Sequence, residues 1–183
     1  MKAESLQDLY LEQLKDLYDA ENQLIKALPK MAKAASSAEL RRAFEEHLEK
    51  TKEHAQRIET IFEGMGEKAK GQKCKAMEGL VKEGSEVIEE DMVEGVKDAA
   101  LIAAAQRVEH YEMAGYGCVR TYANLLGDSE AANLLEQTLR EEKEADELLG
   151  GIAEQINVAI PQGRNGSAKR TGNPSVRRSR PAA

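Results

Sequence analysis

The sequence predicts an all-α protein: a bundle of four long helices with one long crossover connection that contains a short fifth helix. Charged residues make up 32% of the 183 residues, aromatic residues make up only 4%, and tryptophan is absent, which favours helix over strand. Only one of the four prolines, Pro29, lies before residue 160. Apolar residues recur every three or four positions in four long stretches, joined by two short turns and one long connection.

The first two stretches predict a helical hairpin. Residues 5–35 carry an amphipathic stripe of leucines, in which Pro29 is a candidate kink because proline removes a backbone donor and clashes with the preceding turn. Ser36 and Ser37 are typical of a helix cap, so a second helix is expected to begin there and to end near Gly64.

The middle of the chain predicts the crossover and the third long helix. Residues 67–73 are rich in lysine and glycine, and a shorter connecting helix is expected across about 75–90. Asp98 precedes a strongly apolar run that continues at helical spacing to Leu125, with Gly127 as a stop signal.

The last helix is expected to follow a cap at Asp128 or Ser129, so residues 1–157 form one helical domain. Residues 158–183 contain six basic and no acidic residues and are rich in Gly, Ser and Pro. The net charge of −7 therefore leaves −13 for the rest of the chain. This composition predicts a disordered basic tail, which either keeps the protein soluble or contacts polyanions such as nucleic acid.

The cysteines and the hydropathy pattern point to the cytoplasm. Cys74 and Cys118 lie far apart and match no CxxC or zinc spacing, so they are interpreted as free thiols in a reducing compartment. No stretch of 18 apolar residues occurs, and the N-terminus has no basic segment followed by an apolar run. Neither a membrane span nor secretion is expected.

Acidic residues that fall within the apolar stripes carry the functional information. Glu21 lies in the stripe of the first helix, Glu109 and Glu112 lie one turn apart on one face of the third, and Glu142 with Asp146 face inward on the fourth. Any one of them is more often exposed or paired with Lys or Arg, but burying all of them without compensation would cost many kcal/mol. A bound metal ion is the direct way to neutralise such a group.

Histidines could complete such a site. His54 lies near the inward edge of the second helix and is balanced between a ligand and a surface histidine, whereas His47 and His110 are interpreted as supporting or structural residues. Two helices that each give Glu and two that each give a Glu-x-x-His pair form the di-iron carboxylate arrangement. Carboxylates with some imidazole suit iron, with manganese as the alternative.

Several stretches resemble a known family, the YciE/YciF-like ferritin-like stress proteins of bacteria. These stretches are residues 75–81 (KAMEGLV), residues 98–112 (DAALIAAAQRVEHYE) with Tyr116 and Gly117, and residues 139–146 (LREEKEAD), and the resemblance spans about residues 4–157. It implies a rubrerythrin-like, ferritin-like fold, a cytoplasmic homodimer and a ferroxidase-type site.

The second helix departs from the wider ferritin-like pattern. Glu21, Glu109, Glu112 and Glu142 match the acids of that pattern. Where it has Glu-x-x-His on the second helix, however, this chain has Thr51 three residues before His54. Asp146 stands where many relatives have histidine.

Two classes of function follow. One is an oxidoreductase in which O2 or peroxide oxidises two Fe(II) ions, as a ferroxidase or peroxidase, with manganese catalase-like chemistry as a variant. Glu112 and Glu142 would bridge the ions, and the terminal ligands would be Glu21, His54, Glu109 and Asp146. The other is a non-enzymatic, stress-induced structural or interaction protein with a degenerate metal site and a polyanion-binding tail. Iron storage in a large shell is a third, weaker alternative.

Overall fold

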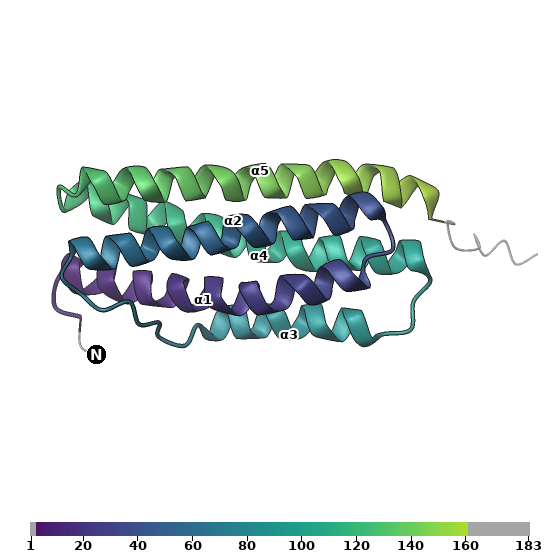
Figure 1. Cartoon of the computed structure of the whole chain (residues 1–183), viewed down its shortest axis with the longest axis horizontal. Helices are drawn as coiled ribbons and strands as arrows, with labels where there is room; N and C mark the ends of the chain where they lie inside the picture. Colours follow the sequence, from purple (N-terminus) through teal and green to yellow (C-terminus); the bar gives the residue numbers. More distant parts are fainter. Residues whose placement is uncertain (1–2, 161–183) are drawn as a thin grey trace, which may run out of the picture.

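The computed structural model describes residues 3–160, which form five helices and no strand. The helices are α1 (Leu6–Ala34), α2 (Ala38–Gly64), α3 (Lys75–Glu89), α4 (Glu94–Leu125) and α5 (Ser129–Ala159) (Figure 1). The predicted all-α class, the four long helices and the short helix in the crossover are confirmed.

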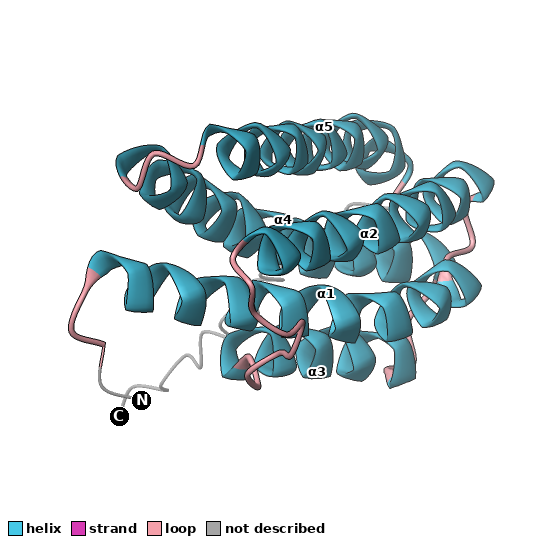
Figure 2. Cartoon of the chain, turned by 60° about the vertical axis from the view of Figure 1, so that its left-hand side comes forward, coloured by secondary structure: helices cyan, strands magenta, loops and turns pink. Residues whose placement is uncertain are grey.

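The four long helices pack as two hairpins around a common core. Helix α1 packs against α2, and α4 against α5, while α1–α4 and α2–α5 contacts join the two hairpins. The short α3 lies outside this group, against α1 and α4 (Figures 1 and 2). The crossover therefore covers one side of the bundle, and its Cys74 and Met77 are buried in one of the core clusters.

The turn between α1 and α2 is tied to α4 by Asp98. The sequence suggests that α4 begins after this residue, but α4 begins at Glu94. The Asp98 carboxylate accepts hydrogen bonds from the backbone N–H groups of Ser36 and Ser37 and from the Ser36 hydroxyl, at 2.6–2.9 Å. Asp98 thus holds the start of α2, whose own cap is the Ser37 side chain.

The other helix ends agree with their local signals. Helix α1 remains continuous through Pro29 to Ala34. Gly127 adopts a φ of +80° after α4, a conformation that glycine tolerates best, and the Asp128 side chain caps α5. Helix α5 continues past the predicted domain end at residue 157, and residues 161–183 of the predicted tail lie outside the described residues.

A buried polar layer separates two apolar clusters in the bundle. Every long helix contributes to both clusters and places at least one buried polar side chain between them. One cluster includes Leu24, Phe44, Leu101 and Leu149, and the other includes Leu14, Ile58, Val119 and Leu135. Burial of these apolar side chains drives packing and brings the polar side chains to one height. None of the described helices is long and apolar enough to cross a membrane.

Candidate metal centre

Six ionisable side chains form the polar layer, and each is at most 8% exposed. They are Glu21 from α1, His47 and His54 from α2, Glu109 and Glu112 from α4, and Glu142 from α5. The two histidines are seven residues apart, which is two helical turns, and the α4 glutamates are three residues apart, which is about one turn. Each pair therefore projects from a single helix face.

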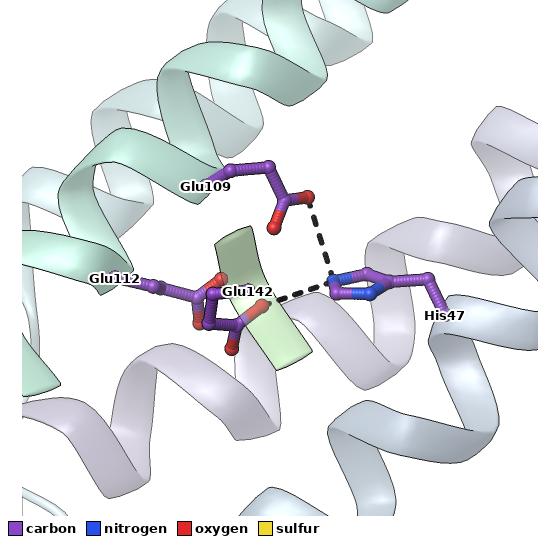
Figure 3. Close-up of side chains that lie close together, drawn as sticks. All are labelled: His47, Glu109, Glu112 and Glu142. Carbon is purple, nitrogen blue, oxygen red and sulfur yellow. Dashed lines mark ion pairs between the residues drawn. The ribbon is translucent and has the colours of Figure 1, made fainter. Parts of the chain in front are cut away.

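The ligand-type atoms of these residues form two overlapping groups. His47, Glu109, Glu112 and Glu142 make up the first, and their donor atoms lie within 4.8 Å of one another (Figure 3). In this group His47 Nε2 lies 3.4 Å from Glu109 Oε1 and 3.7 Å from Glu142 Oε2. Figure 3 shows the three carboxylates and the imidazole turned toward one space.

Glu21, His54 and Glu142 make up the second group, also within 4.8 Å. His54 Nδ1 lies 3.0 Å from Glu142 Oε1 and 3.6 Å from Glu21 Oε1. Glu142 belongs to both groups. Glu112, the other bridge expected from the sequence, falls in the first group only.

Neighbouring side chains hold the second group in place. Glu141 Oε2 lies 3.0 Å from His54 Nε2 and 2.5 Å from an Arg57 guanidinium nitrogen. This arrangement fixes the imidazole ring so that Nδ1 faces Glu142 and Glu21. The Tyr116 hydroxyl, which is buried, donates a hydrogen bond to Glu21 Oε1.

Burial and mutual charge control protonation of the cluster. Burial raises the pKa of Glu109 and Glu112 well above the usual range, and the charge of Glu142 raises it further. Burial also raises the pKa of Glu21, although His54 opposes this. Burial alone would lower the pKa of His54, but the nearby Glu142 and Glu21 outweigh it and raise the pKa to about 10. Conversely, His54 outweighs the effect of burial on Glu142 and lowers its pKa.

These pKa shifts indicate that protons on the cluster would take the place of the positive charge of a metal ion. The raised pKa of His54, about 10, favours its charged form at neutral pH, and the raised pKa values of Glu109 and Glu112 favour their neutral, protonated forms. Burial lowers the pKa of His47, which leaves its imidazole neutral and its lone pair available to a metal ion.

The buried atoms without a hydrogen-bond partner show whether a metal ion fits this cluster. Among the described residues, ten buried side-chain nitrogen or oxygen atoms have no hydrogen-bond partner, and nine of them belong to the six cluster residues. Even His54 Nδ1 is one of them, because its 3.0 Å approach to Glu142 lacks hydrogen-bond geometry. An unsatisfied buried polar group costs about 1–3 kcal/mol. Oxygen donors with imidazole suit iron or manganese, so the residues fit a pair of such ions.

The structure brings together five of the six residues that the sequence suggested as ligands. Asp146 is the exception: it lies outside both groups, accepts a hydrogen bond from Gln106 at 3.1 Å and lies 3.7 Å from His110 Nε2. His47, interpreted from the sequence as a supporting residue, instead lies within the first group. The ligand role of each residue remains a prediction.

The ferritin-like pattern on the second helix does not point to His47. That pattern has its second ligand three residues before the histidine, where this chain has Thr51, which is buried and donates its hydroxyl to the His47 carbonyl at 2.8 Å. The available signal was the seven-residue spacing of His47 and His54, which places both imidazoles on one helix face.

Comparison with known proteins places the chain in a family. Residues 5–159 match a family described as a domain of unknown function, DUF892. Protein YciF of Escherichia coli (strain K12) is 47% identical over 154 residues, which cover 84% of this chain and 93% of that protein. The crystal structure of the E. coli stress protein YciF has a TM-score of 0.83 at 45% identity and covers 86% of this chain and 100% of that chain.

Two further solved structures extend the comparison. YcfI from Rhodopseudomonas palustris has a TM-score of 0.78 at 40% identity and covers 80% of this chain and 94% of that chain. A dodecameric thioferritin from Bacteroides fragilis has a TM-score of 0.63 at 17% identity, covering 86% and 93%, and shows the fold alone. The predicted ferritin-like fold and YciF-like resemblance are confirmed. The chain belongs to the DUF892 family, and its fold is that of the ferritin-like helical bundles.

Proposed function

We propose that this protein is a ferritin-like stress-response protein that binds a pair of iron ions within its bundle and acts as an oxidoreductase toward O2 or peroxide. The observation that carries the proposal is the convergence of nine buried nitrogen and oxygen atoms, from four helices, that lack a hydrogen-bond partner. The description of the E. coli relative as a stress protein supports the physiological part.

In this proposal the six residues of the polar layer bind two ions. His47, Glu109 and Glu112 would hold one ion, Glu21 and His54 the other, and Glu142 would contact both. Bound iron would supply the electrons that reduce the oxidant. Manganese remains the alternative metal, because the same donors suit it.

The chain itself contributes orientation and proton control. Glu141 and Arg57 set the direction of the His54 ring, and Tyr116 fixes one oxygen of Glu21. Since the raised pKa values of His54, Glu109 and Glu112 favour their protonated forms in the metal-free protein, metal binding competes with protons at these residues. Uptake of metal is therefore expected to strengthen as pH rises.

A cavity of about 170 Å³ offers a route for the ions. It lies between α2 and α5 and reaches His47 and Glu109. Its lining includes Glu46, Glu141 and Glu144 and a lysine, Lys50, which lies 4.0 Å from Glu144. Negative side chains along such a passage attract cations, so this cavity supports entry of Fe(II) from the α2–α5 side.

Anaerobic titration with Fe(II) tests the metal centre. We expect about two irons per chain, one for each group of donors, followed by an absorbance change when peroxide or O2 is added. Glu112→Gln should lose at least one iron, whereas Glu94→Gln, an exposed control on the same helix, should bind as the wild type does. Absence of iron uptake, or equal uptake by both variants, would overturn the proposal.

The same titration addresses the alternatives. Oxygen evolution from peroxide with Mn(II) but not Fe(II) would select catalase-like chemistry. Iron binding without any oxidation would select the non-enzymatic scaffold. We also propose the homodimer that the family resemblance implies. Light scattering of the full chain measures the molar mass and so distinguishes a dimer from a large storage shell.

A further inference from the structure

A second cavity, of about 250 Å³, lies between α1, α3 and α4. It has the crossover helix on one side, where α3 lies along α1 and α4 (Figure 2). His47 and Glu109 belong to its lining, so the cavity extends to the candidate metal centre. A metal ion or a small oxidant does not need a chamber of this size.

The walls of this cavity suit an apolar chain. Leu28, Met31, Leu80, Val81, Ile88 and Val108 are among its lining residues. Gly84 also belongs to the lining, and a Cβ there would make an ordinary van der Waals contact with Met31 Sδ at 3.7 Å, so only a larger side chain would fill the space. A cavity of about 150 Å³ lined by apolar side chains holds six-carbon benzene, so this volume corresponds to about ten carbon atoms.

Two lysines give the cavity a charged side. Lys26 and Lys30 line it from α1, one helical turn apart, and both are exposed. Within the part of the chain that the structure describes, neither has an acidic partner. Over residues 3–160, the lining contains no arginine and no other lysine. The charges therefore favour a ligand with a carboxylate at the surface and an alkyl chain pointing inward.

We propose that this cavity binds a medium-chain fatty acid of about ten carbons, with its carboxylate at Lys26 and Lys30 and its chain directed toward His47 and Glu109. The bound chain brings an organic group beside the candidate metal centre. The binding itself requires no metal. Its failure and the failure of iron binding are therefore separate outcomes.

Calorimetric titration of the metal-free full-length protein with decanoate, below the concentration at which decanoate self-associates, tests the cavity. We expect saturable binding of one molecule per chain. Gly84→Leu should fill the space and weaken binding at least tenfold. It should also leave the fold intact, because leucine favours helix more than glycine does. Gly79→Leu is the matched control, since Gly79 lies on the same helix with nothing within 4 Å of its Cβ position.

The headgroup is tested separately. The double variant Lys26→Gln and Lys30→Gln should weaken decanoate binding roughly three- to tenfold, the range expected for two exposed charge pairs. Lys33→Gln, on the same helix and outside the cavity lining, should have no effect. Decyltrimethylammonium should bind much more weakly than decanoate. Absence of saturable decanoate binding, equal affinity of well-folded Gly84→Leu protein, or equal affinity for the cationic amphiphile would overturn the proposal.

Discussion

His54 is held between carboxylates on both ring nitrogens. Its Nε2 lies 3.0 Å from Glu141 Oε2, and its Nδ1 faces Glu142 and Glu21. Arg57 contacts Glu141 in turn and, against the effect of burial, lowers the pKa of that carboxyl to about 2. Glu141 therefore stays charged at any physiological pH and keeps the ring in one orientation.

Removal of the charge on Glu141 should weaken metal binding without removing a donor. Glu141→Gln is expected to lower Fe(II) or Mn(II) affinity about tenfold, since loss of a partner that orients a ligand typically costs ten- to a hundredfold. Competition with a chelating dye measures this. Glu147→Gln, exposed on the same helix, is the control, and equal affinities for the two variants would show that Glu141 does not position the ring.

Substitution of His47 and substitution of Asp146 should have opposite effects on the ion expected between His47, Glu109, Glu112 and Glu142. His47→Ala should reduce iron binding from about two ions to about one, because only Glu109, Glu112 and the shared Glu142 remain there. Asp146→Asn should keep both ions, since Asp146 lies outside the two groups. Metal analysis after anaerobic loading with Fe(II) distinguishes the two outcomes. Loss of an iron from Asp146→Asn but not from His47→Ala would identify Asp146 as the ligand instead.

At the scale of helices, Asp98 shows what periodicity alone does not reveal. An acidic residue before an apolar run is typical of a helix start. Asp98 is instead 3% exposed within α4 and accepts hydrogen bonds from the α1–α2 turn. The stripes predicted the helices well because their spacing is local, whereas this contact joins residues about 60 positions apart and has no local signal.

Loss of this contact should be costly. Asp98→Ala removes a buried carboxylate that accepts three hydrogen bonds from Ser36 and Ser37, so we expect a loss of about 2–4 kcal/mol in the free energy of unfolding. Urea unfolding measures the change. Asp91→Ala, at an exposed position before α4, should change stability by less than about 0.5 kcal/mol. A loss below about 1 kcal/mol for Asp98→Ala would show that the turn is held by other contacts.

Replacement of Pro29 is expected to raise the stability of the protein. It is exposed inside a helix that continues to Ala34, so it removes one internal hydrogen bond from α1. Pro29→Ala should therefore stabilise the protein by about 1–3 kcal/mol, less the entropy that proline removes from the unfolded chain. Thermal unfolding would show a higher midpoint. A lower midpoint would mean that proline's effect on the unfolded chain dominates.

At the scale of the whole molecule, the polar layer brings six buried ionisable side chains together, and a positive charge among them would offset the cost of burying the carboxylates. The sequence predicted the layer's glutamates because each interrupts an apolar stripe. It did not predict how these side chains divide into two groups, because that depends on how the α1–α2 and α4–α5 hairpins face each other. This packing places His47 inside a group and Asp146 outside both.

The metal-free protein should therefore lose stability as pH rises. The pKa of His54 is raised from 6.5 to about 10 in the folded state, so its contribution is fully present below pH 6.5 and is lost as pH rises through about 10. The raised pKa values of Glu109 and Glu112 act in the same direction above the ordinary value of 4.5. The lowered pKa of Glu142 acts oppositely, but only at acidic pH.

Between pH 7 and 9.5 we expect the free energy of unfolding of the metal-free protein to fall by a few kcal/mol, as urea titration would show. Metal binding should flatten this dependence, since the ions replace the protons that His54, Glu109 and Glu112 would otherwise lose. Metal-free His54→Gln should also be flatter than the wild type, because the titrating imidazole is gone. If the metal-free wild type and His54→Gln showed the same slope, the proton on His54 would not link pH to folding.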